Sequence, residues 1–310
     1  MANTYGKVSG TFEEIENAYG KVSGTWQEAD EIYAKNSGTW ELVFAAFTAT
    51  SYTTLSSGSG TFTVPDGANA LHVQASAGGG GGAAGGIDYD KANGESAGAG
   101  GGSGAYVSDK VFTVVEGETI TYSVGGGGAA GNQTSNFGQP RVASPGTNTT
   151  LSGSSTGALF TLVGGGGSSG INGGVQGPLR TNIAGTAGTD TISGTAITSG
   201  NFTDTNYSVQ NVTSNTSGPV GTFNQSGNGN VGVLVGSGNS GGDNVSIAGF
   251  DGGDSYAGSG AISGGSGSPI GGSSSAGTRG SGGGGGAGSP TTNGSAGGAG
   301  EVQYRFLRVN

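Results

Sequence analysis

The sequence contains no cysteine, one histidine and only 7 prolines among 310 residues. Without cysteine, neither disulfide bonds nor thiolate metal sites can stabilise the fold. The single histidine, His72, cannot form a histidine-rich metal cluster, and it lies on the polar face of a predicted strand, where we expect a surface or sheet-packing role. Because proline is scarce and no Gly-X-Y period occurs, collagen is excluded. We expect no enzymatic activity, no metal site and no cofactor.

Charge and long apolar runs are also scarce. Charged residues make up 10% of the chain, and the net charge is −10, which excludes a basic surface that follows nucleic-acid phosphates. No run approaches the roughly 18 apolar residues of a membrane helix, and the first residues lack the basic and apolar parts of a secretory signal. We therefore expect synthesis in the cytoplasm without a signal peptide, and no membrane insertion.

Glycine is abundant. The chain has 74 glycines, and hydrophobic residues account for only 31% of it, too few for a conventional core over the whole length. Such a composition borders on low complexity, so wholesale disorder is the alternative, although the low charge is unlike a solvated coil. We expect backbone pairing, thin sheets and other subunits to supply the stability.

A pattern of alternating strand and glycine run organises the chain from residue 61. Residues 61–82 read TFTVPDGANALHVQASAGGGGG, and related patterns return at 111–128 and 159–167. Apolar residues recur with period two on both sides of the turns at Pro65-Asp66-Gly67 and Glu116-Gly117, which predicts two half-buried hairpins. The last ten residues, EVQYRFLRVN, predict a closing strand that pairs with the opening sheet.

The glycine runs need another explanation, because a glycine strand interior offers no side chain to pack. We consider the left-handed three-fold helix, which rises about 3.1 Å per residue and has no internal hydrogen bonds. Where every side chain is a hydrogen, neighbouring helices can bond to each other through their amides. Polyglycine II helices at runs such as 78–82 and 282–286 are therefore our hypothesis.

The first 47 residues contain a repeat of 14 residues. The blocks YGKVSGTF, YGKVSGTW and YAKNSGTW each place Ser-Gly between two strand-prone flanks, so each predicts a hairpin. A single two-stranded hairpin is marginal in water, so we interpret residues 1–47 as an attachment and oligomerisation module, with a solvent-exposed meander as the alternative. Its aromatic residues are Tyr5, Phe12, Tyr19, Trp26, Tyr33 and Trp40. The polar stretch 48–60 predicts a linker, and 61–310 a glycine-rich β domain that ends in the strand 301–310.

The blocks TFTVPDGA, LHVQASAGGGGG and GGAGEVQYRFLR resemble the glycine-rich domain of bacteriophage tail fibres and related virion proteins. The YGKVSGTW units are similar to short repeats of phage tail proteins. The resemblance implies a tail fibre, adhesin or tail-tip component. In T-even-type adhesins, glycine-rich motifs form a polyglycine II sandwich that displays variable loops to the host receptor. This sequence differs from that group in its N-terminal repeats and in its fewer glycine runs.

Candidate contact residues are exposed aromatic residues in polar stretches, since a ring gives apolar contact area at low entropic cost. The set is Tyr89, Phe137, Phe202, Tyr207 and Tyr256. These residues either contact a host glycan or outer-membrane protein, or simply cover the glycine lattice. Two stretches around Asp190 and Asp254 approach a calcium-binding nonapeptide, but each lacks a glycine and a tandem copy.

The sequence thus predicts an all-β virion protein that is not an enzyme. As a tail fibre or adhesin, it would attach to other virion proteins through its N-terminal repeats, as a homotrimer, and present the glycine-rich domain to the host. A tail or capsid decoration protein without receptor activity is the first alternative. A glycine-rich cell-surface or ice-binding protein is the second.

Overall fold

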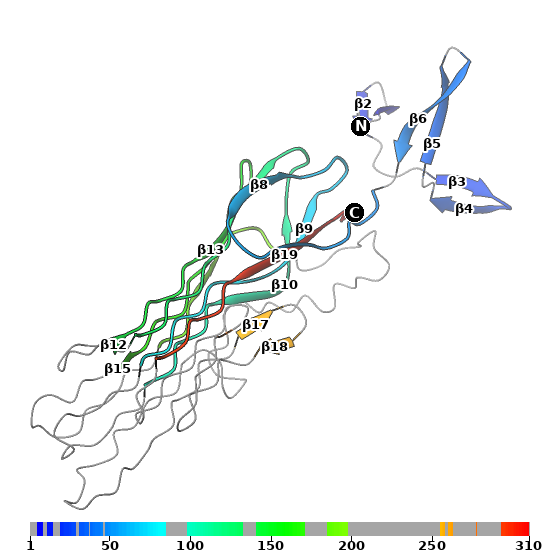
Figure 1. Ribbon diagram of the computed structural model, residues 1–310. Helices are drawn as coiled ribbons and strands as arrows, with labels where there is room; N and C mark the ends of the chain where they lie inside the picture. Colours follow the sequence, from blue (N-terminus) through cyan, green and yellow to red (C-terminus); the bar gives the residue numbers. More distant parts are fainter. Residues whose placement is uncertain are drawn as a thin grey trace, which may run out of the picture.

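The computed structural model describes residues 5–8, 11–14, 19–28, 31–36, 38–45, 47–84, 98–132, 141–170, 185–197, 255–257, 260–262, 277 and 293–309. Over these residues the protein is built from antiparallel strands and contains no helix (Figure 1). The predicted all-β fold class is confirmed. The glycine run at 282–286 lies outside the described residues.

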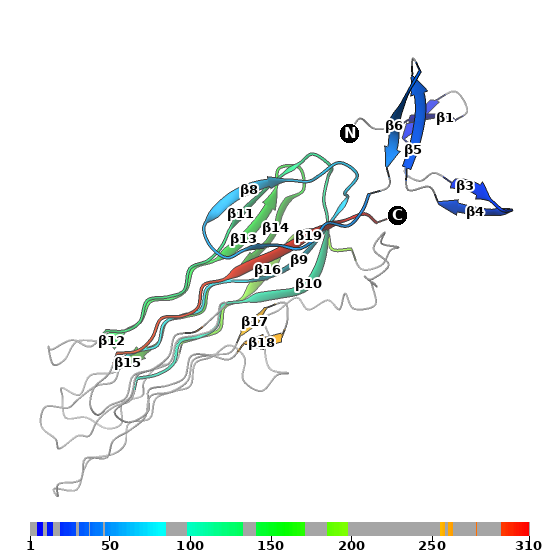
Figure 2. The ribbon, with the colours of Figure 1, turned by 45° about the vertical axis from the view of Figure 1, so that its right-hand side comes forward.

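Three separate two-stranded sheets form the N-terminal part (Figure 2). In the middle one, Val22 pairs with Thr25, so Ser23 and Gly24 make a two-residue turn with φ of 50° and 88°. Positive φ at both turn positions matches the right-handed twist of the flanking strands. The strands are β1 (Tyr5–Val8), β2 (Thr11–Glu14), β3 (Tyr19–Val22), β4 (Thr25–Glu28), β5 (Glu31–Asn36) and β6 (Thr39–Ala45).

Two larger sheets pack face to face as a β-sandwich. The first has the strand order β10-β9-β19-β7, and the second β16-β14-β13-β11-β8. Their inner faces share one apolar core, in which Leu71, Phe112, Ile120 and Phe160 are at most 1% exposed. The strands are β7 (Thr53–Leu55), β8 (Ser59–Thr63), β9 (Ala70–Ser76), β10 (Tyr106–Thr113), β11 (Thr119–Ser123), β13 (Thr149–Gly153), β14 (Gly157–Leu162), β16 (Asp190–Ile192) and β19 (Glu301–Leu307).

The predicted hairpins at 61–75 and 111–124 are wrong in their pairing, although the strands exist. β8 pairs with β11, whereas β9 pairs with β10 and β19 in the other sheet. Each turn carries the chain across the sandwich, and the two crossings bond to each other: the Val64 N–H donates to the Glu118 carbonyl and the Gly117 N–H to the Val64 carbonyl. Buried Val64 lies between the sheets, which a flat hairpin does not allow.

The ends of the domain meet in the first sheet. The closing strand is confirmed, because β19 pairs with β9 along its whole length and with β7 on its other side. The predicted linker at 48–60 differs from the structure, since it contains all of β7 and the first two residues of β8. β7 is a short strand at the edge of the first sheet, and the polar composition of 48–60 does not predict it.

Seven strands of the sandwich continue directly into extended glycine-rich segments, which run side by side away from the sandwich as a bundle (Figure 1). At its far end, β12 (Arg141–Val142) pairs with β15 (Ser169–Gly170). The bundle therefore inherits its arrangement from the sandwich. Its segments are residues 77–84, 98–105, 124–132, 143–148, 163–168, 185–189 and 293–300.

Candidate functional site

The central segment of the bundle, 77–84, is bonded to its neighbours with a period of three residues. Its amides donate in turn to three different segments, each antiparallel to it. Ala77, Gly80 and Ala83 donate to the carbonyls of Ala105, Gly102 and Ala99; Gly78 and Gly81 to those of Thr147 and Ser144; Gly79 and Gly82 to those of Gly298 and Ser295. The bond lengths are 2.8–3.1 Å. Every third residue therefore meets the same neighbour.

Its carbonyls follow the same rule. Gly165 and Ser168 donate to the carbonyls of Gly78 and Gly81, and Gly128 and Gly131 to those of Gly79 and Gly82. None of these hydrogen bonds joins two residues of segment 77–84 itself. Five segments thus hold the central one through main-chain hydrogen bonds, and all its residues are buried.

The segments approach too closely for side chains. A Cβ built on Gly78, Gly80 or Gly81 would lie under 3.0 Å from the carbonyl group of Gly126, Gly166 or Ala129, respectively. Backbone atoms of a bonded neighbour cannot move aside as a flexible side chain does. Gly126 differs, because a Cβ there would meet only the Thr147 Oγ1, at 3.8 Å. Glycine at most buried positions of the bundle is thus a requirement of the packing.

Two buried hydroxyl groups add side-chain hydrogen bonds to those between the main chains of the bundle. Thr149 Oγ1 donates to the Ser76 carbonyl and accepts from the Gly125 amide, where the bundle joins the sandwich. Ser168 Oγ accepts from the Ala83 amide and donates to the Ala99 carbonyl. Both residues are fully buried. In a sequence so rich in serine and threonine, no local signal distinguishes them from the others.

A buried carboxylate joins two turns at the other end of the sandwich. Glu118 is 4% exposed and accepts hydrogen bonds from the amides of Val115, Ser155 and Thr156 and from the Thr156 hydroxyl. Burial alone would raise the pKa of the Glu118 carboxyl, but these hydrogen bonds outweigh it and lower the pKa below its usual value. No local sequence pattern distinguishes Glu118 from the other acidic residues.

Glu118 makes stability depend on pH in the acid range. Because its pKa is lower in the folded chain, its contribution is present above the unfolded value, near 4.5, and is lost as pH falls through the folded value. We expect Glu118→Gln to lower the free energy of unfolding by about 2 kcal/mol at pH 7. Urea denaturation at pH 7 and pH 3 measures this, with Glu116→Gln, which removes a half-buried carboxylate with one hydrogen bond, as control. A wild-type advantage of equal size at both pH values would contradict the assignment.

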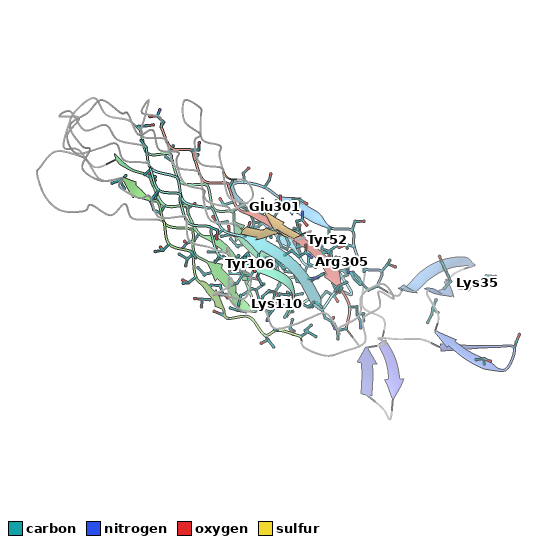
Figure 3. All side chains as sticks on the ribbon, turned by 90° about the horizontal axis from the view of Figure 1, so that it is seen from below. Lys35, Tyr52, Tyr106, Lys110, Glu301 and Arg305 are labelled. Atoms are coloured by element: carbon teal, nitrogen blue, oxygen red, sulfur yellow. The ribbon has the colours of Figure 1, made fainter. Side chains whose placement is uncertain are left out.

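Of the two roles expected for His72, at the surface or in sheet packing, the structure shows the second. Its side chain is 1% exposed, with Nδ1 2.9 Å from the Tyr52 hydroxyl and 3.4 Å from Arg305 Nε, which donates to it. Figure 3 labels Tyr52 and Arg305, which lie near each other. The Arg305 guanidinium lies 4.8 Å from the centre of the Tyr52 ring. This cluster fixes the segment before β7 against β9 and β19.

The five predicted contact residues are not brought together by the described structure. Tyr89, Phe137, Phe202 and Tyr207 lie outside the described residues. In the sequence, Tyr89 falls between the described segments 77–84 and 98–105, and Phe137 between 124–132 and β12. Tyr256 belongs to β17 (Ser255–Ala257), which pairs with β18 (Gly260–Ile262) and packs beside β9 and β10 of the sandwich.

The aromatic residues of the N-terminal repeats occupy equivalent places in the three hairpins. Phe12, Trp26 and Trp40 each lie directly opposite a lysine on the paired strand, namely Lys7, Lys21 and Lys35. Tyr5 and Tyr19 each pair with a glutamate, whereas Tyr33, which is 48% exposed, pairs with Leu42 after a register shift. The repeat in sequence thus has a counterpart in strand register.

Metal-binding chemistry is not evident in the described part of the chain. No group of three or more histidine and acidic side chains gathers there, and Asp190 is a residue of β16 that pairs with Leu162. Asp254 lies outside the described residues. The part of the chain that the structure describes contains no helix of the length and hydropathy needed to span a bilayer.

An antiparallel sandwich whose strands continue into laterally bonded glycine segments defines a glycine-rich β protein. The profile of the family described as "Glycine-rich domain" matches residues 53–307, from the first residue of β7 to the last of β19. The chain belongs to this family. No curated protein matches it.

Proposed function

We propose that the chain is a structural protein of a bacteriophage virion, a tail fibre or adhesin that attaches at one end and recognises the host surface at the other. The separation of the two ends of the domain supports this proposal. The N-terminal module enters at the sandwich, where the Thr50 amide donates to the Phe306 carbonyl next to the end of β19. Segment 77–84, segment 124–132 and β15 run away from the sandwich, and we propose that the stretches that follow them in the sequence, 85–97, 133–140 and 171–184, present the binding surface.

The bundle would act as a stiff spacer between these ends. We infer that it is a polyglycine II lattice, because the three-residue period, the lateral bonding and the exclusion of Cβ atoms are what such a lattice requires. Its shape is set by neighbouring main chains, so the connecting stretches can vary in sequence without altering the support. This is a useful property for a surface that must recognise a changing receptor.

The N-terminal hairpins would supply the attachment. Each is a sheet of only two strands, and such a hairpin is marginally stable alone in water. We propose that they pair with another virion protein and with the hairpins of two further copies in a homotrimer. The aromatic residues opposite the lysines would provide the contact area.

Binding of purified full-length protein to bacterial cells tests the proposal. We expect it to adsorb to cells that the phage infects and to reduce plaque formation when added first. We expect Tyr89→Ala and Phe137→Ala to weaken adsorption by about tenfold each, as removal of an aromatic anchor does.

Tyr256→Ala is the matched control, because this tyrosine lies beside the sandwich and away from the far end of the bundle. It should adsorb like the wild type. Failure of the wild-type protein both to adsorb and to compete would overturn receptor recognition and favour a decoration protein. A loss confined to Tyr256→Ala would overturn the assignment of the binding end.

A further inference from the structure

One outer stretch of the bundle carries main-chain groups that the fold does not use. In segment 124–132, the amides of Gly128 and Gly131 and the carbonyls of Gly128 and Ala129 bond to neighbouring segments. Among the described residues, no partner binds the amides of Gly127, Ala129 and Ala130 or the carbonyls of Gly127 and Ala130. Gly126, Gly127 and Ala129 are exposed. We call residues 126–130 the open stripe.

The open stripe resembles the edge of a sheet, whose unpaired amides and carbonyls form a template for another chain. Neighbouring positions are protected. Pro145 on the adjacent segment has no amide, and Thr147 Oγ1 accepts the Gly126 N–H at 2.7 Å. The exposed positions 127 and 129 of the stripe carry only hydrogens and one methyl group, so no comparable side-chain hydrogen bond protects them.

These observations restrict the occupant. It must bring hydrogen-bond donors and acceptors at the three-residue spacing. It must also lack bulky side chains where it touches the stripe, because the segments of the bundle approach each other too closely for side chains. The same stripe on a second copy of the chain meets both conditions. Although the chain has a net charge of −10, which repels copies from one another, segment 124–132 contains no charged residue.

We propose that the open stripe is a self-association surface, through which the glycine bundles of two copies bond side by side. The carbonyls of Gly127 and Ala130 accept from amides of the second copy, and the free amides of the stripe donate in return. The lateral bonding inside one bundle thereby continues into the next. This inference is independent of host recognition and of the N-terminal hairpins.

Lysine substitutions on the stripe test the proposal, because lysine is a residue that protects natural sheet edges. Gly126→Lys and Ala129→Lys place the new side chain outward, since a Cβ at 126 has ordinary contacts and residue 129 already has one. Thr121→Lys is the control, on an exposed position of β11. All three should retain the wild-type melting temperature, which shows that the fold is intact.

Amide hydrogen exchange of Gly127, Ala129 and Ala130 in the full-length protein, measured against concentration together with sedimentation velocity, gives the readout. The Gly128 amide is left out because it already donates to the Gly79 carbonyl within the bundle. Where about nine-tenths of the copies are associated, these amides should exchange about tenfold more slowly, because only the free fraction exchanges. Thr121→Lys should behave like the wild type, and both stripe variants should exchange rapidly throughout. An exchange rate of these amides that does not change with protein concentration would overturn the proposal, whether the protein stays monomeric or associates through another surface. Wild-type association of Ala129→Lys would overturn it too.

Discussion

Replacing Gly81 with alanine should destabilise the protein by about 3 kcal/mol, near the upper end of what overpacking a core costs. The added methyl group would lie against the Ala129 carbonyl, whose oxygen accepts the Ser144 amide. Relief requires segments 77–84 and 124–132 to separate, which breaks hydrogen bonds such as the one from the Gly131 amide to the Gly82 carbonyl. Denaturant unfolding of the wild type and the variant measures the loss.

Gly126→Ala is the matched control, since it adds the same methyl group to the same bundle with 3.8 Å of clearance. Because alanine also restricts the unfolded chain, this variant should equal or exceed the wild type by up to about 1 kcal/mol. Equal destabilisation by both substitutions would show that glycine is needed for some reason other than close approach of the segments.

Phe112→Ala should destabilise the protein by about 4 kcal/mol and lower the melting temperature by roughly 10 °C, because it leaves a cavity in the core of the sandwich. Phe112 is 0% exposed, and its ring centre lies 6.1 Å from that of Phe160. Val115→Ala, at a side chain that is 49% exposed, should change stability by less than about 0.5 kcal/mol.

The same variant tests whether the bundle depends on the sandwich. β10 follows segment 98–105 without a break, so loosening its packing should also weaken the register of that segment against 77–84. We expect the amides of Gly80 and Ala83 to exchange faster in Phe112→Ala. Unchanged protection in the bundle, with the sandwich destabilised, would mean that the two parts fold independently.

Local patterns in the sequence predict the strands well. The period-two alternation at Leu71, Val73 and Ala75 places all three in the core, and the alternation of the last ten residues predicts the closing strand. These patterns do not predict which strands pair with each other. The turns at Gly67 and Gly117 have φ of 82° and 75°, which many hairpins share, and only the buried position of Val64 shows that the chain changes sheets there.

The bundle illustrates a second limit. The glycine runs predict close approach of main chains, but a run of identical residues contains no information on which neighbour each amide meets. The sandwich determines which segments are neighbours, because each segment begins or ends at a strand whose register is fixed by side chains. The roles of Ser168 and Glu118 arise from the same three-dimensional arrangement and have no signature in a chain so rich in polar residues.

Amide hydrogen exchange at Gly78–Gly82 in the full-length protein tests most directly whether main-chain bonding between glycine segments forms an ordered interior. If it does, these amides should exchange about a thousandfold or more slowly than those of an unstructured peptide, since they open only with the fold. Exchange at the rate of a free peptide, in a protein whose β9 amides remain protected, would contradict the account.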